Sequence, residues 1–183
     1  MNPATNNKNT ISDRNPKISV SVQNILKKYG ALEALRGVSF DVFKGEIFGI
    51  IGPDGAGKTT LFRILTTLIL ADEGMASVEG LDVVKDYKEI RKRVGYMPGR
   101  FSLYQDLSVE ENLRFFATLF HTTIKKNYDL VKDIYSQLEP FKNRRAGALS
   151  GGMKQKLALS CALIHKPDVL FLEIGRASCR ERV

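Results

Sequence analysis

Residues 52–60 combine glycines, a lysine and a hydroxyl in an order suited to holding phosphate. Together they match the phosphate-binding loop pattern G-x-x-x-x-G-K-[ST] and read Gly52, Pro53, Asp54, Gly55, Ala56, Gly57, Lys58, Thr59, Thr60. The glycines permit turns that side chains would block, so consecutive backbone N–H groups can point at phosphate oxygens. Lys58 supplies a positive charge for the β- and γ-phosphates, and the Thr59 hydroxyl can ligate Mg²⁺. We therefore expect a site for a nucleotide with its magnesium ion.

The segments on either side of this loop are of the kind that the loop requires. Residues 46–51 form a short apolar run that predicts a buried strand, and residues 59–70 have apolar side chains at helical spacing. The loop would then lead from a strand into a helix N-terminus, whose dipole favours anions.

The rest of the chain predicts an α/β fold. Alternation or apolar runs predict strands at residues 18–26, 35–43, 76–78 and 94–97, with a last strand near 167–172. Helices are expected at 87–93, 108–120 and 125–138, the second opened by a capping box of Ser108 and Glu111. Helices thus cluster between residues 108 and 140, which indicates a helical insertion in a nucleotide-binding core.

Composition indicates one intracellular globular domain. The 183 residues are 43% apolar, and the two cysteines exclude a disulfide framework. We find no apolar run long enough to span a membrane and no signal peptide. The net charge of +8 is spread over several elements without an aromatic-basic stripe, so we expect no nucleic-acid partner.

A second motif follows the predicted helices. It consists of Leu149, Ser150, Gly151, Gly152 and Met153. Ser150 can cap a helix that begins at Gly151, and the capped N-terminus would make a second anion site.

With both motifs in this order, residues 18–172 resemble the ATP-binding subunits of ABC transporters. The resemblance implies a P-loop NTPase core of the ABC ATPase type, with an antiparallel β-subdomain and a helical subdomain at about residues 100–150. It also implies that two such domains, as a homodimer or a paired ATPase domain, sandwich two ATP molecules head to tail. The Ser150 motif would bind the γ-phosphate of the ATP held by the partner's phosphate-binding loop. A transmembrane permease subunit and a place at the cytoplasmic inner face of the cell membrane follow from the same resemblance.

Further positions are carried over from the family. Tyr29 matches the aromatic residue that stacks on adenine, and Thr60 matches a hydroxyl that contacts the α-phosphate. Asp54 stands where many members have asparagine, and its carboxylate is unfavourable beside phosphates unless it points to solvent. Asp54 and residues 104–113 resemble the drug and antibiotic exporter branch.

Two departures from the family pattern bear on hydrolysis. Gly99 stands where these ATPases carry a glutamine that reaches Mg²⁺ and water and links the ATP site to the permease. Gln105 lies in a segment that already aligns and does not replace it, so slower or differently coupled hydrolysis is expected. After Leu172 the family has aspartate for Mg²⁺ and glutamate as general base, whereas this chain continues with Glu173 and Ile174.

We interpret residues 173–183 as a non-native tail. Their back-translation resembles, from its second base onward, a widely used short-read sequencing adapter, so the family's magnesium aspartate and general-base glutamate are expected to be lost to truncation. The expected organisation is a disordered lead-in at residues 1–16, a cassette domain incomplete at its C-terminus at 17–172, and this tail. His165 precedes the last strand, so it is not the family's switch histidine and is expected on a surface loop.

The sequence therefore predicts an ATP-binding and ATP-hydrolysing subunit that powers export, with a chain that binds ATP but lacks catalytic competence as written. Two alternatives stay open: a non-transport ABC ATPase without a permease, and a regulatory nucleotide binder without turnover.

Overall fold

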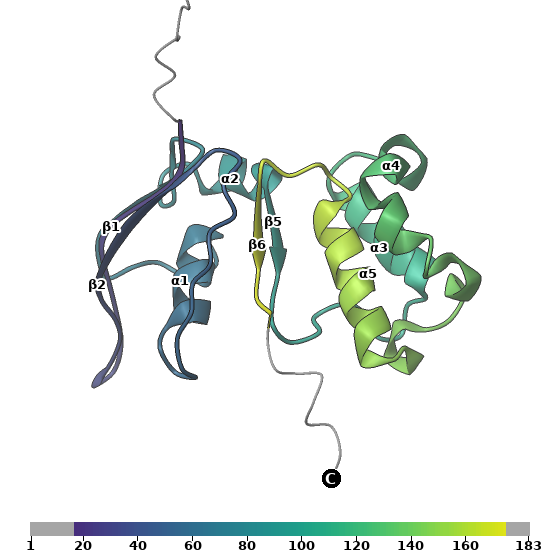
Figure 1. The fold of residues 1–183 in the computed structure, drawn as a ribbon, viewed down its shortest axis with the longest axis horizontal. Coiled ribbons are helices and arrows are strands. Elements are labelled where there is room, and N and C mark those ends of the chain that lie inside the picture. The colour runs from purple at the N-terminus through teal and green to yellow at the C-terminus, as the bar shows by residue number, and fades with distance from the viewer. Residues whose placement is uncertain (1–16, 175–183) are drawn as a thin grey trace, which may run out of the picture.

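The computed structural model describes residues 17–174, which form two lobes joined through a short pair of strands (Figure 1). The first, here called the sheet lobe, is an antiparallel sheet in the order β2-β1-β3-β4 that curves around one helix. Its elements are β1 (Ile18–Tyr29), β2 (Leu32–Phe43), α1 (Lys58–Leu65), β3 (Glu73–Val78) and β4 (Leu81–Asp82). The predicted antiparallel β-subdomain is thus present.

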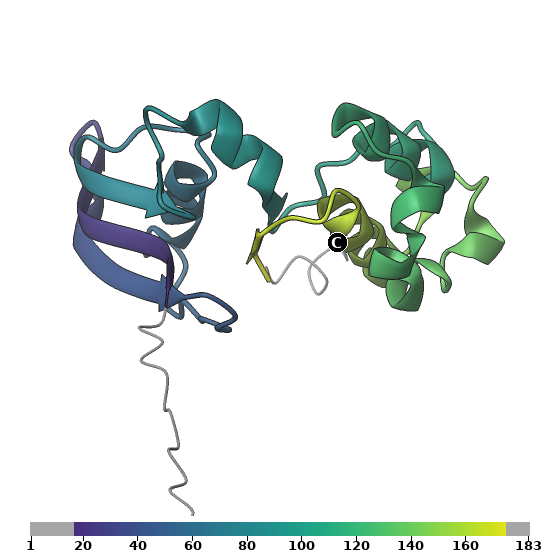
Figure 2. The ribbon, with the colours of Figure 1, turned by 90° about the horizontal axis from the view of Figure 1, so that it is seen from above.

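The joining elements lie between the lobes. They are α2 (Tyr87–Arg93), β5 (Val94–Met97) and β6 (Val169–Leu172), and β5 pairs with β6 in parallel. Seen from above, this strand pair stands between the sheet lobe and a separate group of helices (Figure 2). β5 and α2 have the bounds that their sequence patterns predict, whereas β6 begins at Val169, two residues after the predicted start.

The second, helical lobe contains α3 (Val109–Leu119), α4 (Ile124–Tyr135), the short 3₁₀ turns η1 (Glu139–Phe141) and η2 (Ala146–Ala148), and α5 (Gly151–Leu163). The capping box that opens α3 is confirmed, since the Ser108 hydroxyl accepts from the Glu111 N–H and the Glu111 carboxylate accepts from the Ser108 N–H. Among helices in the described part of the chain, none has the length and apolar character required to cross a membrane.

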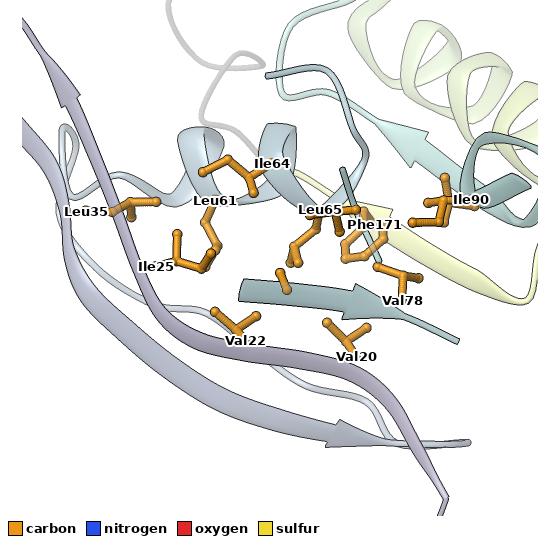
Figure 3. Close-up of a cluster of buried hydrophobic side chains, with 13 residues drawn as sticks. Val20, Val22, Ile25, Leu35, Leu61, Ile64, Leu65, Val78, Ile90 and Phe171 are labelled. Carbon is orange, nitrogen blue, oxygen red and sulfur yellow. The ribbon is translucent and has the colours of Figure 1, made fainter. Parts of the chain in front are cut away.

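Each lobe has its own hydrophobic core. In the sheet lobe, Leu61, Ile64 and Leu65 of α1 pack against Val20 and Val22 of β1 (Figure 3). In the helical lobe, the fully buried side chains include Leu113, Val131, Leu138 and Leu157. Separate cores mean that each lobe is held together mainly by its own side chains.

The lobes meet where α5 crosses β5. A Cβ at Gly95 would lie 2.5 Å from the Ala162 carbonyl oxygen, so only glycine allows this approach. Just beyond α5, the His165 ring stacks on Phe120 at 3.8 Å between centroids, and its Nε2 lies 3.1 Å from the Val94 carbonyl oxygen. His165 is in a loop, as predicted, but it is half-buried and not on the surface, because this joint encloses it.

The strand predicted at residues 46–51 is wrong. In the described residues no strand pairs with this segment, and the Ile47 and Ile51 side chains are 101% and 98% exposed. Phe48 points the other way and stacks on Phe40 of β2 at 5.0 Å. The apolar alternation is present, but a buried strand also needs hydrogen-bonded neighbours on its edges, which residues 17–174 do not provide.

The helix predicted at residues 59–70 is shorter than expected. It ends at Leu65, because the Thr66 hydroxyl donates to the Phe62 carbonyl and Thr67 adopts a left-handed φ of 62°. Arg91 donates to both the hydroxyl and the carbonyl oxygen of Thr67 and thereby holds this turn in place.

Candidate functional site

The loop of residues 52–60 has the turned backbone that phosphate binding requires. Gly55 and Gly57 have φ values of 84° and 83°, in the left-handed region that favours glycine. A Cβ at Gly57 would also lie 2.2 Å from the Ala34 carbonyl oxygen. Gly57 is the residue before α1, so the loop ends directly at the N-terminus of this helix.

Lys58 reaches back across the loop. Its ammonium group donates to the carbonyl oxygens of Gly52 and Pro53 at 2.7 and 2.6 Å. These bonds hold the positive charge against the loop, beside the backbone groups that would face phosphate oxygens. Asp54, at the same loop, is exposed, which is the position in which its carboxylate interferes least with an anion.

Glu173, predicted to be the first residue of the non-native tail, lies at this site, so the chain as given keeps a carboxylate at the position where the family's magnesium aspartate is expected to be lost. The Thr59 hydroxyl donates to Oε2 of Glu173 at 2.9 Å, and the Tyr96 hydroxyl donates to Oε1 of Glu173 at 2.5 Å. Burial and the neighbouring Glu173 carboxylate raise the pKa of Tyr96, so its phenol stays protonated and acts as a donor.

These oxygens suit a magnesium ion. Mg²⁺ prefers hard oxygen ligands and is held in nucleotide sites by one or two protein groups together with phosphate oxygens. Thr59 and Glu173 offer such a pair next to Lys58, and residues 17–174 contain no cluster of three acidic, histidine or cysteine side chains that would suit another metal. The residues present therefore fit Mg²⁺, which would add positive charge for the phosphates.

Tyr29 lies at the end of β1, which pairs with β2, the strand that borders a small hollow beside the loop. Its ring is 47% exposed, and the Lys27 ammonium lies 5.8 Å from the ring centroid. The hollow, of about 320 Å³, is lined by residues of β2 and by Gly55 and Ala56 of the loop. An exposed ring face is available for stacking on a base.

The second motif opens α5, in the other lobe. Ser150 is confirmed as the N-cap, because its hydroxyl accepts from the Met153 N–H at 3.4 Å, while Gly151 and Gly152 are exposed. Leu149 is buried in the helical core and anchors this end. Figures 1 and 2 both place α1 and α5 on opposite sides of the β5–β6 pair, so one chain does not bring together the two helix N-termini predicted to bind anions.

Gly99 follows β5 and Pro98, a residue that lines a groove between the lobes. The groove, of about 910 Å³, is lined by Tyr96, Met97 and Pro98 on one side and by aromatic and aliphatic residues at the end of α3 on another. With no side chain, Gly99 gives the site neither a side-chain ligand nor a side-chain hydrogen-bond donor.

Sequence reasoning found the loop and the Ser150 motif, and it missed the contact of Tyr96 with Glu173. A tyrosine three residues before Gly99 carries no motif, and the two residues are 77 positions apart in the chain. The parallel register that pairs Tyr96 with Phe171 brings them together, and only the three-dimensional structure gives that register.

Comparison with known proteins agrees with this geometry. A family model described as ABC transporter matches residues 35–173. The probable multidrug ABC transporter ATP-binding protein YbhF of Escherichia coli (strain K12) is 37% identical over 156 residues, which are 84% of this chain and 27% of that protein. The ABC transporter ATP-binding protein NatA of Bacillus subtilis (strain 168) is 36% identical over 149 residues, 80% of this chain and 61% of NatA. The chain thus spans less than two thirds of these relatives.

Solved structures agree as well. A structure of the ATP-binding subunit of an ABC transporter superposes with a TM-score of 0.74 at 27% identity, covering 82% of this chain and 64% of that one. A dimeric ATP-binding cassette in a post-hydrolysis state, bound to ADP and phosphate, gives a TM-score of 0.73 at 25% identity and covers 82% and 72%. The predicted P-loop NTPase fold is confirmed, and the chain belongs to the ABC transporter family as an ATP-binding cassette.

Proposed function

We propose that this chain binds ATP with Mg²⁺ at residues 52–60 and forms part of the ATPase that powers an ABC exporter. The observation that carries the proposal is the cluster at the start of α1, where glycine turns, the Lys58 ammonium and the Thr59–Glu173 oxygens lie together. Backbone N–H groups and Lys58 would hold the phosphates, and Thr59 and Glu173 would hold the cation. Tyr29 would stack on adenine, and Thr60 would contact the α-phosphate.

A second cassette is the first partner that this geometry supports. The capped N-terminus of α5 offers N–H groups to an anion, yet α1 and α5 lie on opposite sides of β5 and β6. If a second copy or a paired ATPase domain turns its Ser150 motif toward this loop, each ATP is held by both chains. The solved dimeric relative with ADP and phosphate supports this arrangement.

A transmembrane permease is the second proposed partner. The groove beside Gly99 has an apolar wall and lies next to the end of β5, so a partner seated there would adjoin the nucleotide site. YbhF is named a probable multidrug transporter protein and a further relative, LnrL of Bacillus subtilis, a linearmycin resistance protein, which favours drug or antibiotic export. The cassette would then work at the cytoplasmic face of the membrane.

Hydrolysis by this chain is expected to be slow even where ATP binds. Gly99 cannot orient water, and Ile174 follows Glu173 where a carboxylate would serve as general base. Phosphate release should be close to background for this chain alone, and a rate above about 1 s⁻¹, typical of enzymes, would contradict this expectation. The regulatory alternative is separated from transport by turnover of a full-length chain that carries the family's aspartate and glutamate after Leu172, since ordinary turnover there removes it.

The test of binding compares two lysine variants. Titration of the chain with a fluorescent ATP analogue in the presence of Mg²⁺ should show saturable binding, and Lys58→Ala should weaken it by at least about 10-fold, because a charge-assisted contact worth about 1.5–3 kcal/mol is lost. The control is Lys132→Ala, which removes an exposed lysine from α4 in the helical lobe. Equal affinities of the two variants would refute the proposed site.

A further inference from the structure

Tyr96 joins the nucleotide site to the wall of the groove. Its ring lines the groove between the lobes, while its hydroxyl donates to Oε1 of Glu173. The backbone between them is fixed as well, because the Glu173 N–H donates to the Met97 carbonyl at 2.9 Å and extends the β5–β6 pairing past its last residue. The tyrosine and the carboxylate therefore come from neighbouring parallel strands held in one register.

The two hydroxyls that contact Glu173 engage different oxygens. Thr59 contacts Oε2 and Tyr96 contacts Oε1, so the carboxylate is oriented from both sides. A cation held by Thr59 and Oε2 would leave the bond from Tyr96 to Oε1 in place. Groups that hydrogen-bond a metal-binding carboxylate in this way orient the ligand and raise the affinity for the metal.

We propose that Tyr96 is a positioning residue for the magnesium site, holding the Glu173 carboxylate toward Thr59. This inference rests on the proposed binding of ATP with Mg²⁺. Gly99 contributes no side chain from the same segment, and within β5 it is the Tyr96 side chain that donates to the Glu173 carboxylate. The contact also gives the groove wall a direct connection to the site, through one phenol ring.

The experiment separates metal binding from nucleotide binding. The dissociation constant of the full chain for ATP is measured with Mg²⁺ and again with EDTA, and the ratio of the two gives the gain due to the metal. Tyr96→Phe keeps the ring in the groove wall and removes only the hydroxyl. We expect it to reduce this gain by about 10-fold and to leave the affinity in EDTA unchanged.

A matched tyrosine serves as the control. Tyr128 donates to Glu139 at 2.8 Å in the helical lobe, so Tyr128→Phe removes the same kind of bond away from the site and should leave the gain unchanged. Glu173→Gln removes the charge that Tyr96 is proposed to hold, so adding Tyr96→Phe to it should have no further effect.

The outcomes that overturn the inference are distinct from those that overturn the proposed function. An unchanged gain in Tyr96→Phe overturns the inference, and so does an equal loss with Mg²⁺ and with EDTA, which would mark a general structural role. A full reduction by Tyr96→Phe in the Glu173→Gln background overturns it too. A chain that binds no ATP under either condition overturns the proposed function, and this inference with it.

Discussion

Because Gly95 lies close to the backbone of α5, we expect a side chain at this position to destabilise the joint between the lobes. In Gly95→Ala the added Cβ would lie 2.5 Å from the Ala162 carbonyl oxygen, 2.7 Å from Leu170 Cδ1 and 3.1 Å from Pro167 Cγ. Ordinary carbon contacts need about 3.5–4 Å, so α5 must move by about 1 Å. The nearest atom belongs to the backbone, which cannot turn aside as a side chain would. The expected loss is therefore at the upper end of overpacking costs, about 3 kcal/mol in the free energy of unfolding.

The assay is equilibrium urea unfolding followed by circular dichroism. The control is Gly49→Ala, because a Cβ at Gly49 meets no atom within 4 Å and its φ is not in the left-handed region. It should change the free energy of unfolding by less than about 0.5 kcal/mol. If Gly95→Ala lies within that range of the control at an unchanged m-value, the lobes are not joined by this contact and the reasoning is refuted.

Three further predictions concern stability. Asn112→Ala should lower the free energy of unfolding in urea by about 2–3 kcal/mol. The Asn112 amide is fully buried, accepts from the Tyr104 N–H and donates to the Tyr104 and Ser108 carbonyls. A loss below about 1 kcal/mol would contradict this prediction. Ser108→Ala should cost about 1 kcal/mol through loss of the cap of α3, and an unchanged midpoint would refute that value. Burial lowers the pKa of His165 below its usual 6.5, so the unfolded chain takes up this proton more readily. The free energy of unfolding should then fall below about pH 6.5, by at most about 1.4 kcal/mol per pH unit. Unfolding at several pH values should show a smaller fall in His165→Phe, and equal slopes would contradict the cause.

The features that could be predicted from sequence are those whose signals are local. Helix α2, strand β5 and the capping box before α3 occur where their patterns place them, because a strand stop or a cap needs only adjacent residues. The loop of residues 52–60 and the Ser150 cap could be predicted for the same reason. A motif of nine or five consecutive residues carries its backbone geometry within itself.

The features that could not be predicted depend on distant partners. Residues 46–51 have the composition of a buried strand, but pairing depends on which strands lie beside them. Helix α1 ends at Leu65 because Arg91, from another element, fixes the turn at Thr67. The contact of Tyr96 with Glu173 requires the parallel register of two strands. The burial of His165 comes from contacts with Phe120 and β5, which no local sequence pattern reveals. The sequence alone therefore predicts a surface position for it.

The N-termini of α1 and α5 lie in separate lobes. This separation has a consequence for dimers formed from two different variants. If each ATP lies between the loop of one chain and the Ser150 motif of another, a chain carries two halves of different sites. A chain defective only at Lys58 and a chain defective only at Ser150 would each fail when paired with itself. Paired with each other, they would regain one intact site out of two, so mixing two inactive preparations should restore ATP-dependent dimerisation.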